Sequence, residues 1–110
     1  MTRLSSLAVG LAAFWLAAAP ASAAGDPAAG RKKAQQCQAC HGIDGVAKLP
    51  DAPNLAGQNE VYLVKAMHDF RTGTRKNEVM SVLAPTLGNQ DILDLAAWYA
   101  SIPVDVKVPQ

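Results

Sequence analysis

Two cysteines and a histidine lie together in the run Cys37-Gln38-Ala39-Cys40-His41, and the chain has no other cysteine. Two thiols at this spacing can each add across one vinyl group of a haem and form a thioether, while the adjacent imidazole binds the iron. Each residue type has its own role in this chemistry, so the five-residue pattern is far more specific than a bare C-x-x-C. The run predicts one covalently attached haem c, with His41 as an iron ligand.

Two other kinds of site would use the same cysteines. The first is a disulfide or a thioredoxin-like redox pair, but that motif belongs with a βαβ pattern, and none is visible in the sequence. The second is a zinc site built from Cys37, Cys40 and His68. It would need a fourth ligand, and His41 is poorly placed to bind the same ion as the neighbouring Cys40.

An iron held by His41 has a second axial position, which is either open or taken by another side chain. The candidates are Met67, His68 and Met80. Met67 falls on an apolar helical stripe and is also explained as core filling, whereas His68 lies beside that stripe and is expected at the surface. Met80 follows a break in the pattern at residues 73–77, so it is not obliged to face a helix core. Spacing alone does not separate Met67 from Met80.

The N-terminus has the pattern of a secretory signal peptide. Arg3 supplies a basic start, residues 4–19 an apolar run, and residues 21–23 the small-x-small sequence that signal peptidase cuts. The apolar run is too short and too rich in alanine for a membrane span. We therefore expect a cleaved signal peptide over residues 1–23, one domain over residues 24–110, export to the periplasm, and no membrane insertion after cleavage.

The remaining 87 residues form a small and formally neutral domain, with nine Lys and Arg residues against nine Asp and Glu residues. The absence of a strong basic field excludes nucleic acid as a partner. A chain of this size with few aromatic residues builds an undersized core and usually needs a metal, a disulfide or a cofactor for stability. The composition therefore fits a domain whose core is completed by a cofactor.

The hydrophobic periodicity predicts an all-α domain of several short helices joined by long loops. The expected helical segments are residues 27–37, 60–72, 78–84 and 90–102. The expected N-caps are Asp26, Asn59 and Asn89, and the expected stops are Gly73, Pro85 and Pro103. The clearest apolar stripe lies in the last helix, at Ile92, Leu95, Ala96, Tyr99 and Ile102. Residues 42–58 form an irregular loop, and a loop of that length usually wraps something.

Family-like stretches follow one another through nearly all of residues 24–110. They are residues 37–42, 52–58, 62–73, Met80 and 92–99. In these stretches the sequence resembles the class I c-type cytochromes, particularly the short bacterial periplasmic proteins with one haem and the halves of related dihaem respiratory cytochromes. Besides the haem motif, Pro53-Asn54-Leu55 and Phe70-Arg71-x-Gly73 are the most telling segments.

The resemblance implies a cytochrome c fold wrapped around one covalent haem. It also implies that Met80 is the second axial ligand and that the carbonyl of Pro53 holds the other ring nitrogen of His41. Arg71, with Tyr62 and Trp98, would serve the haem propionates or the haem edge. For Arg71 the alternative is a cation at a helix end, and for Trp98 it is ordinary packing.

A His/Met pair favours ferrous iron and raises the reduction potential, and six-coordinate iron leaves no open site for a substrate. The sequence therefore predicts a soluble electron carrier rather than an enzyme. Its partners would be other redox proteins, bound transiently, and the chain would be a monomer or a weak dimer. The alternative is a haem subunit of a redox enzyme complex, or a gas-binding haem sensor with a labile sixth ligand.

Overall fold

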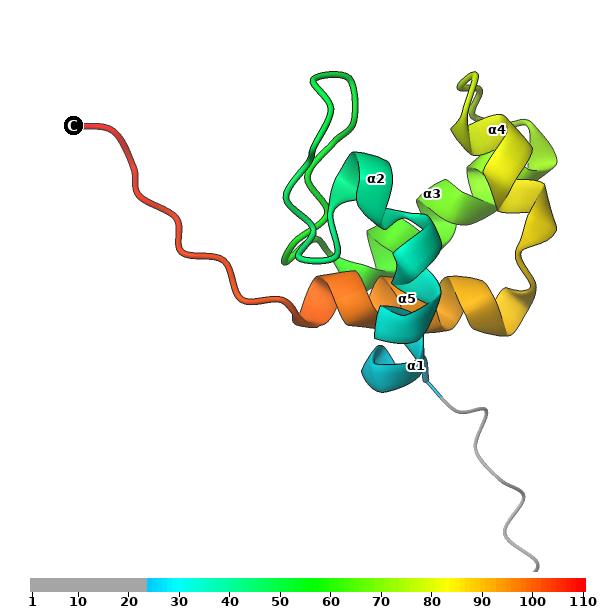
Figure 1. Cartoon of the computed structure of the whole chain (residues 1–110), viewed down its shortest axis with the longest axis horizontal. Coiled ribbons are helices and arrows are strands. Elements are labelled where there is room, and N and C mark those ends of the chain that lie inside the picture. The colour runs from blue at the N-terminus through cyan, green and yellow to red at the C-terminus, as the bar shows by residue number, and fades with distance from the viewer. Residues whose placement is uncertain (1–23) are drawn as a thin grey trace, which may run out of the picture.

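The computed structural model describes residues 24–110, which form short helices and contain no strand (Figure 1). In chain order these are α1 (Pro27–Lys33), the 3₁₀ turn η1 (Ala34–Gln36), α2 (Gln38–His41), α3 (Glu60–Thr72), α4 (Met80–Leu83), the 3₁₀ turn η2 (Ala84–Thr86) and α5 (Asn89–Ser101). The all-α prediction is confirmed. The predicted signal peptide, residues 1–23, lies outside the described residues.

Two of the helices, α1 and α3, begin at their predicted N-caps, and α3 also ends at the predicted glycine. The carboxylate of Asp26 accepts the backbone N–H of Ala28 at 2.9 Å, and the amide oxygen of Asn59 accepts that of Tyr62 at 3.0 Å. Both contacts satisfy donors that the first turn of a helix leaves without a partner. Gly73 ends α3 in the left-handed conformation, with φ of 81°, which a residue with a Cβ rarely adopts.

The predicted cap of the last helix is wrong by one residue. Gly88 is the N-cap, and its N–H is accepted at 2.9 Å by the carboxylate of Asp91, which reaches back from the first turn. Asn89 is already helical, and its side chain accepts a hydrogen bond from Arg71 at 2.7 Å. The amide that the sequence assigns to helix capping is therefore used to join α3 to α5.

Two helical segments differ from their predicted extents. The segment predicted as one helix over residues 27–37 is an α-helix only as far as Lys33. It is followed by the 3₁₀ turn η1 and then by the separate helical turn α2, which carries most of the haem motif. The segment predicted over residues 78–84 begins at Met80, and Pro85 lies inside a 3₁₀ continuation rather than ending the helical path.

The helix α1 packs across α5 at very short range (Figure 1). A Cβ built on Gly30 would lie 1.9 Å from the backbone oxygen of Asp94 and 2.8 Å from the Cβ of Trp98. No side chain fits in that space, so only glycine lets the two backbones approach so closely. This crossing ties the beginning of the domain to its end.

A buried carboxylate fastens the same crossing. Asp94 accepts hydrogen bonds from the N–H of Asp26 at 2.8 Å, the ammonium of Lys33 at 2.7 Å and the amide of Gln90 at 2.9 Å. These donors, with Lys33 first, lower the pKa of Asp94 to about 2. Because the carboxylate is more acidic in the folded chain than in the unfolded one, its contribution is complete above about pH 4 and is lost as the pH falls through about 2.

We expect Asp94→Asn to be less stable than the native chain at pH 7 by about 2 kcal/mol, the size of a shift of this kind. Between pH 5 and pH 2 the native chain should lose that contribution, so the stability difference between the two proteins should shrink. Urea unfolding followed by far-UV circular dichroism at several pH values measures it. Asp51→Asn, at an exposed position, is the control for the removal of one carboxylate.

The apolar core is small, as the composition predicts. Its buried cluster consists of Ala34, Leu63, Leu95, Ala96 and Tyr99, with Ile92 fully buried nearby. The stripe expected on the last helix is confirmed, with Ile102 partly buried at its end. Within residues 24–110, no helix has the length and apolar character needed to cross a membrane.

Candidate functional site

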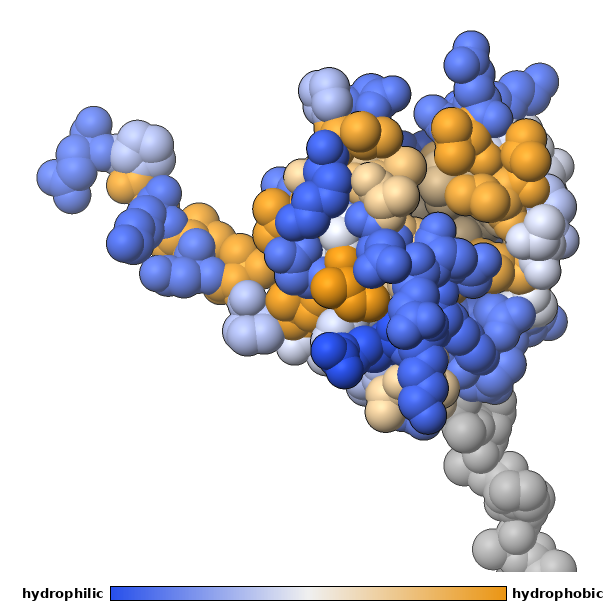
Figure 2. Space-filling view, viewed as in Figure 1, coloured by the Kyte–Doolittle hydropathy of each residue, from blue (hydrophilic) through white to orange (hydrophobic). Residues whose placement is uncertain are grey.

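A cavity of about 420 Å³ opens beside the haem motif. Its walls come from α2, residues 49–55, α3 and α4, and Leu95, Ala96 and Tyr99 of α5 also line it. Figure 2 shows it as a hollow of apolar residues between the α2 side and the α4 side of the molecule. The volume falls within the range of about 300–1,000 Å³ that is usual for small-molecule and cofactor sites.

The imidazole of His41 is held in one orientation. His41 is the last residue of α2 and is buried, and its Nδ1 lies 2.9 Å from the carbonyl oxygen of Pro53. A carbonyl oxygen only accepts, so Nδ1 carries the hydrogen and donates it, which leaves Nε2 with a free lone pair. His41 is among the residues that line the cavity, and the described residues contain no buried side-chain nitrogen without a partner.

The two cysteines border the same cavity as free thiols. They lie three residues apart on a helical turn, closed by the hydrogen bond from the N–H of His41 to the carbonyl of Cys37 at 2.9 Å, and this spacing places side chains on one face. Burial, with a smaller contribution from the charge of Cys40, raises the pKa of Cys37 to about 11. A thioredoxin-like cysteine needs a lowered pKa, so the structure gives that alternative no support.

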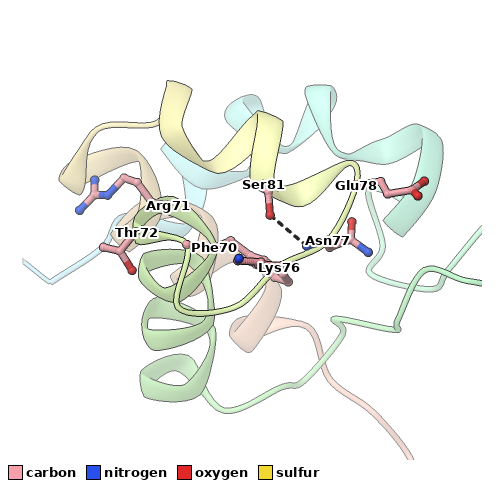
Figure 3. A pocket seen from close by; sticks show the side chains of 8 residues that line it. Phe70, Arg71, Thr72, Lys76, Asn77, Glu78 and Ser81 are labelled. Carbon is pink, nitrogen blue, oxygen red and sulfur yellow. Dashed lines mark hydrogen bonds between the residues drawn. The ribbon is translucent and has the colours of Figure 1, made fainter.

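Both candidate methionines line the cavity. Met67 comes from the middle of α3, and Met80 is the first residue of α4. The side chain of Asn77 accepts the N–H of Met80 at 3.0 Å, and the N–H of Asn77 donates to the hydroxyl of Ser81 at 2.9 Å. Figure 3 shows the second of these contacts in a shallow hollow on the outer side of residues 70–81.

Asn77 is a residue that sequence reasoning did not select. Its side chain accepts the N–H groups of both Val79 and Met80. It therefore fixes the start of α4 and the position of Met80. An asparagine just before a short helical turn is a capping signal, and that signal was available in the sequence.

His68 does not join the cavity lining. It is half-buried rather than at the surface, and its Nδ1 accepts a hydrogen bond from Arg71 at 2.7 Å. No group of three His, Cys, Asp or Glu side chains suited to a metal ion comes together in the described part of the chain. The zinc alternative therefore finds no support in the structure.

Arg71 is not among the residues that line the cavity. It donates to the carbonyl of Leu87 at 3.3 Å as well as to Asn89, and so acts at the end of α3 as a link to α5. Figure 3 shows its side chain pointing away from Glu78 and Asn77. Trp98 also lies outside the lining, where its indole N–H donates to the carbonyl of Ile43 at 2.9 Å.

The arginine that does line the cavity is Arg75. Its guanidinium lies 4.7 Å from the centre of the Phe70 ring and donates to the hydroxyl of Tyr62 at 3.3 Å. Of the three residues that the resemblance places at the haem edge, Tyr62 alone is therefore in the lining. No sequence signal distinguished Arg75 from Arg71, because the loop between them has no periodicity.

The chain matches the cytochrome c family over residues 27–103. It is 50% identical over 86 residues to a cytochrome c4 of Pseudomonas aeruginosa, a match that covers 78% of this chain and 43% of that protein. It is 44% identical over 81 residues to cytochrome c-554(548) of Halomonas halodenitrificans, covering 71% of this chain and 98% of that protein.

A solved structure shares the fold. The reduced cytochrome c4 of Pseudomonas stutzeri superposes with a TM-score of 0.69 at 39% sequence identity, over 76% of this chain and 48% of that one. The chain thus spans less than half the length of the cytochrome c4 relatives that it matches.

Proposed function

The chain belongs to the cytochrome c family, and from this premise we propose that it carries single electrons on one haem c. Cys37 and Cys40 would hold the haem through thioethers, and His41 and Met80 would be its axial ligands. The observation that supports the proposal is the cavity, whose lining includes Cys37, Cys40, His41 and Met80.

The residues that line the cavity fit a haem. Its size and apolar lining suit a flat apolar ring, and its donor set consists of an imidazole and a soft thioether, which are typical ligands of haem iron. When bound, the haem would supply an iron that alternates between the ferric and ferrous states. Pro53 would keep His41 oriented through its carbonyl, a role that outer hydrogen-bond partners usually have at metal sites.

Met80 is favoured over Met67 because of the elements that carry them. Residues of both α2 and α4 line the cavity, and Figure 1 shows these two helices apart from each other, so Met80 from α4 would hold the iron together with His41 from α2. Met67 belongs to the wall between these two helices, where core filling explains it. A methionine thioether would favour the ferrous state and occupy the position that a substrate would need.

The chain's own residues would keep the site dry and rigid. Tyr99 is buried, lines the cavity and donates its hydroxyl to the carbonyl of Gly42 at 3.0 Å, which fixes the chain directly after the haem motif. Gly42 has a φ of 73°, and a Cβ there would lie 2.5 Å from the carbonyl oxygen of Val46. The turn that follows His41 therefore needs glycine.

The partners would be other redox proteins that dock briefly near the cavity mouth. Exposed apolar side chains of Leu49 and Val79 lie at the cavity and give a surface for such contacts. Residues 24–110 are formally neutral, with nine Lys and Arg residues against nine Asp and Glu residues, so steering by charge would be weak. The signal pattern of residues 1–23 supports a location in the periplasm.

Spectroscopy of the native chain, produced by export with haem-ligation machinery present, tests the proposal. Haem staining should survive a denaturing gel, because thioether bonds are covalent. The oxidised protein should show a methionine–iron charge-transfer band in the red, and the reduced protein should not bind carbon monoxide. Colourless protein with two titratable thiols would contradict the haem, whereas carbon monoxide binding without the red band would favour a gas sensor or an enzyme subunit.

A further inference from the structure

Residues 103–109, which follow α5, have the sequence Pro-Val-Asp-Val-Lys-Val-Pro. The side chains of Val104, Val106 and Val108 are 55%, 78% and 82% exposed. Figure 1 shows the segment running away from the helices, and Figure 2 shows apolar and polar residues alternating along it. A period of two is the pattern of a β-strand with one apolar face, but the segment forms no strand and pairs with no other part of residues 24–110.

The base of the segment is attached to the domain. The N–H of Gly57 donates to the carbonyl of Tyr99 at 2.9 Å, and a Cβ on Gly57 would lie only 2.7 Å from the Cγ2 atom of Val104. Val104 is thus packed against the turn at Gly57, while the residues after it extend outward. This contact fixes the point and the direction from which the strand leaves.

We propose that residues 103–109 pair with the same segment of a second copy of this chain, as an antiparallel two-stranded ribbon centred on Val106. In that register Val104 faces Val108 of the second copy, and Asp105 faces Lys107. Directly opposite residues of an antiparallel pair lie on the same face. One face of the ribbon therefore carries only valines, and the other carries two Asp–Lys pairs.

The charges select this register over its neighbours. A shift of one residue would place valines against charged side chains on the wrong face. A shift of two residues in either direction keeps the faces but places Asp105 opposite Asp105, or Lys107 opposite Lys107. Like charges directly opposite each other destabilise a strand pair, so the register centred on Val106 is the favourable one.

The two prolines select the hydrogen-bond pattern. In the ribbon centred on Val106 the N–H groups of the three valines point to the second copy, and those of the residues between them point outward. Pro103 and Pro109, which face each other, then occupy positions where no N–H is needed. The opposite pattern would require both prolines to donate.

The ribbon has two-fold symmetry and therefore stops at a dimer. Because the strands run in opposite directions, the two domains would be attached at opposite ends of the ribbon, roughly 20 Å apart at 3.3 Å per residue. The cavity lining does not include residues 103–109. A two-stranded ribbon alone is only marginally stable, so the dimer is weak and forms at high protein concentration.

Sedimentation equilibrium of the haem-loaded full chain at low salt tests the proposal, with concentrations up to about 1 mM covering weak association. We expect a reversible monomer–dimer equilibrium. Lys107→Asp and Asp105→Lys should each lower the association constant on the order of tenfold or more, since both charge pairs become repulsive. An equimolar mixture of the two variants should restore dimers, because Asp then faces Lys at every pair.

Lys32→Asp is the matched control, since it changes the net charge equally at an exposed position on α1 and should leave association unchanged. Val106→Pro should abolish the dimer by removing the central N–H donor. A native chain that stays monomeric at all concentrations, or a mixture of the two charge variants that does not associate, would overturn the proposal. So would assemblies larger than a dimer, or an equal loss of association in Lys32→Asp. None of these results depends on the axial ligand of the haem.

Discussion

Met80→Ala is expected to abolish the red charge-transfer band and to lower the reduction potential on the order of 0.2 V, a fraction of the roughly 0.8 V that axial ligands span. The physical reason is that removal of a soft thioether removes the ligand that favours ferrous iron. The vacated position should then bind carbon monoxide in the reduced protein. Absorption spectra in both oxidation states and a potentiometric titration measure these effects.

Met67→Ala is the matched control, because both methionines line the cavity. It should keep the red band and a potential close to the native value, and because Met67 is only half-buried its loss of stability should stay below the roughly 2 kcal/mol that truncating a fully buried methionine costs. The reverse result, with the band lost in Met67→Ala and kept in Met80→Ala, would show that the iron ligand is Met67 on α3 and not Met80 on α4. It would leave the covalent attachment at Cys37 and Cys40 unaffected.

Gly30→Ala should destabilise the fold by about 3 kcal/mol, the upper end of the usual cost of overpacking, and lower the melting temperature by roughly 15 °C in a domain of this size. Helix propensity alone predicts the opposite sign, since alanine is better than glycine inside a helix by about 1 kcal/mol. We expect the steric clash with α5 to outweigh the gain in helix propensity, because the new Cβ would lie 1.9 Å from the backbone oxygen of Asp94. Thermal and urea unfolding provide the measurement.

Gly88→Ala tests whether steric crowding is the cause. Gly88 has an ordinary φ of −76°, and the nearest atom to a Cβ there lies at 3.4 Å, on Asp91. We expect a change below about 1 kcal/mol, as for an N-cap substitution. Equal losses in both variants would show that the α1–α5 crossing tolerates a side chain at Gly30.

The helices that the sequence predicted best depend on neighbouring residues only. Asp26, Asn59 and Gly73 act on the chain within one turn, so their residue types were sufficient. The cap of α5 was misplaced because Arg71, 18 positions earlier in the chain, uses the side chain of Asn89. Such a contact exists only after the helices have packed, and no local pattern contains it.

The residues of the site also differ in whether a local signal predicts them. The haem motif is local, and its residues were predicted from spacing alone, whereas the contact between His41 and Pro53 was expected only from the family resemblance. The arginines were harder, because Arg71 and Arg75 stand on either side of the left-handed turn at Gly73. That turn breaks the helical period, so the sequence did not show which guanidinium reaches the cavity.

The hydrogen bond from Asp26 to Asp94 joins residues 68 positions apart. Closing a loop of that length costs chain entropy before any contact repays it, so such contacts form late in folding. A polypeptide that emerges from a translocation pore with its N-terminus first cannot form this bond until α5 has followed. If the chain is exported and carries a haem as proposed, residues 37–41 would still lie on an open segment during that interval, and both sulfurs would be within reach of a haem-attaching enzyme before the domain closes.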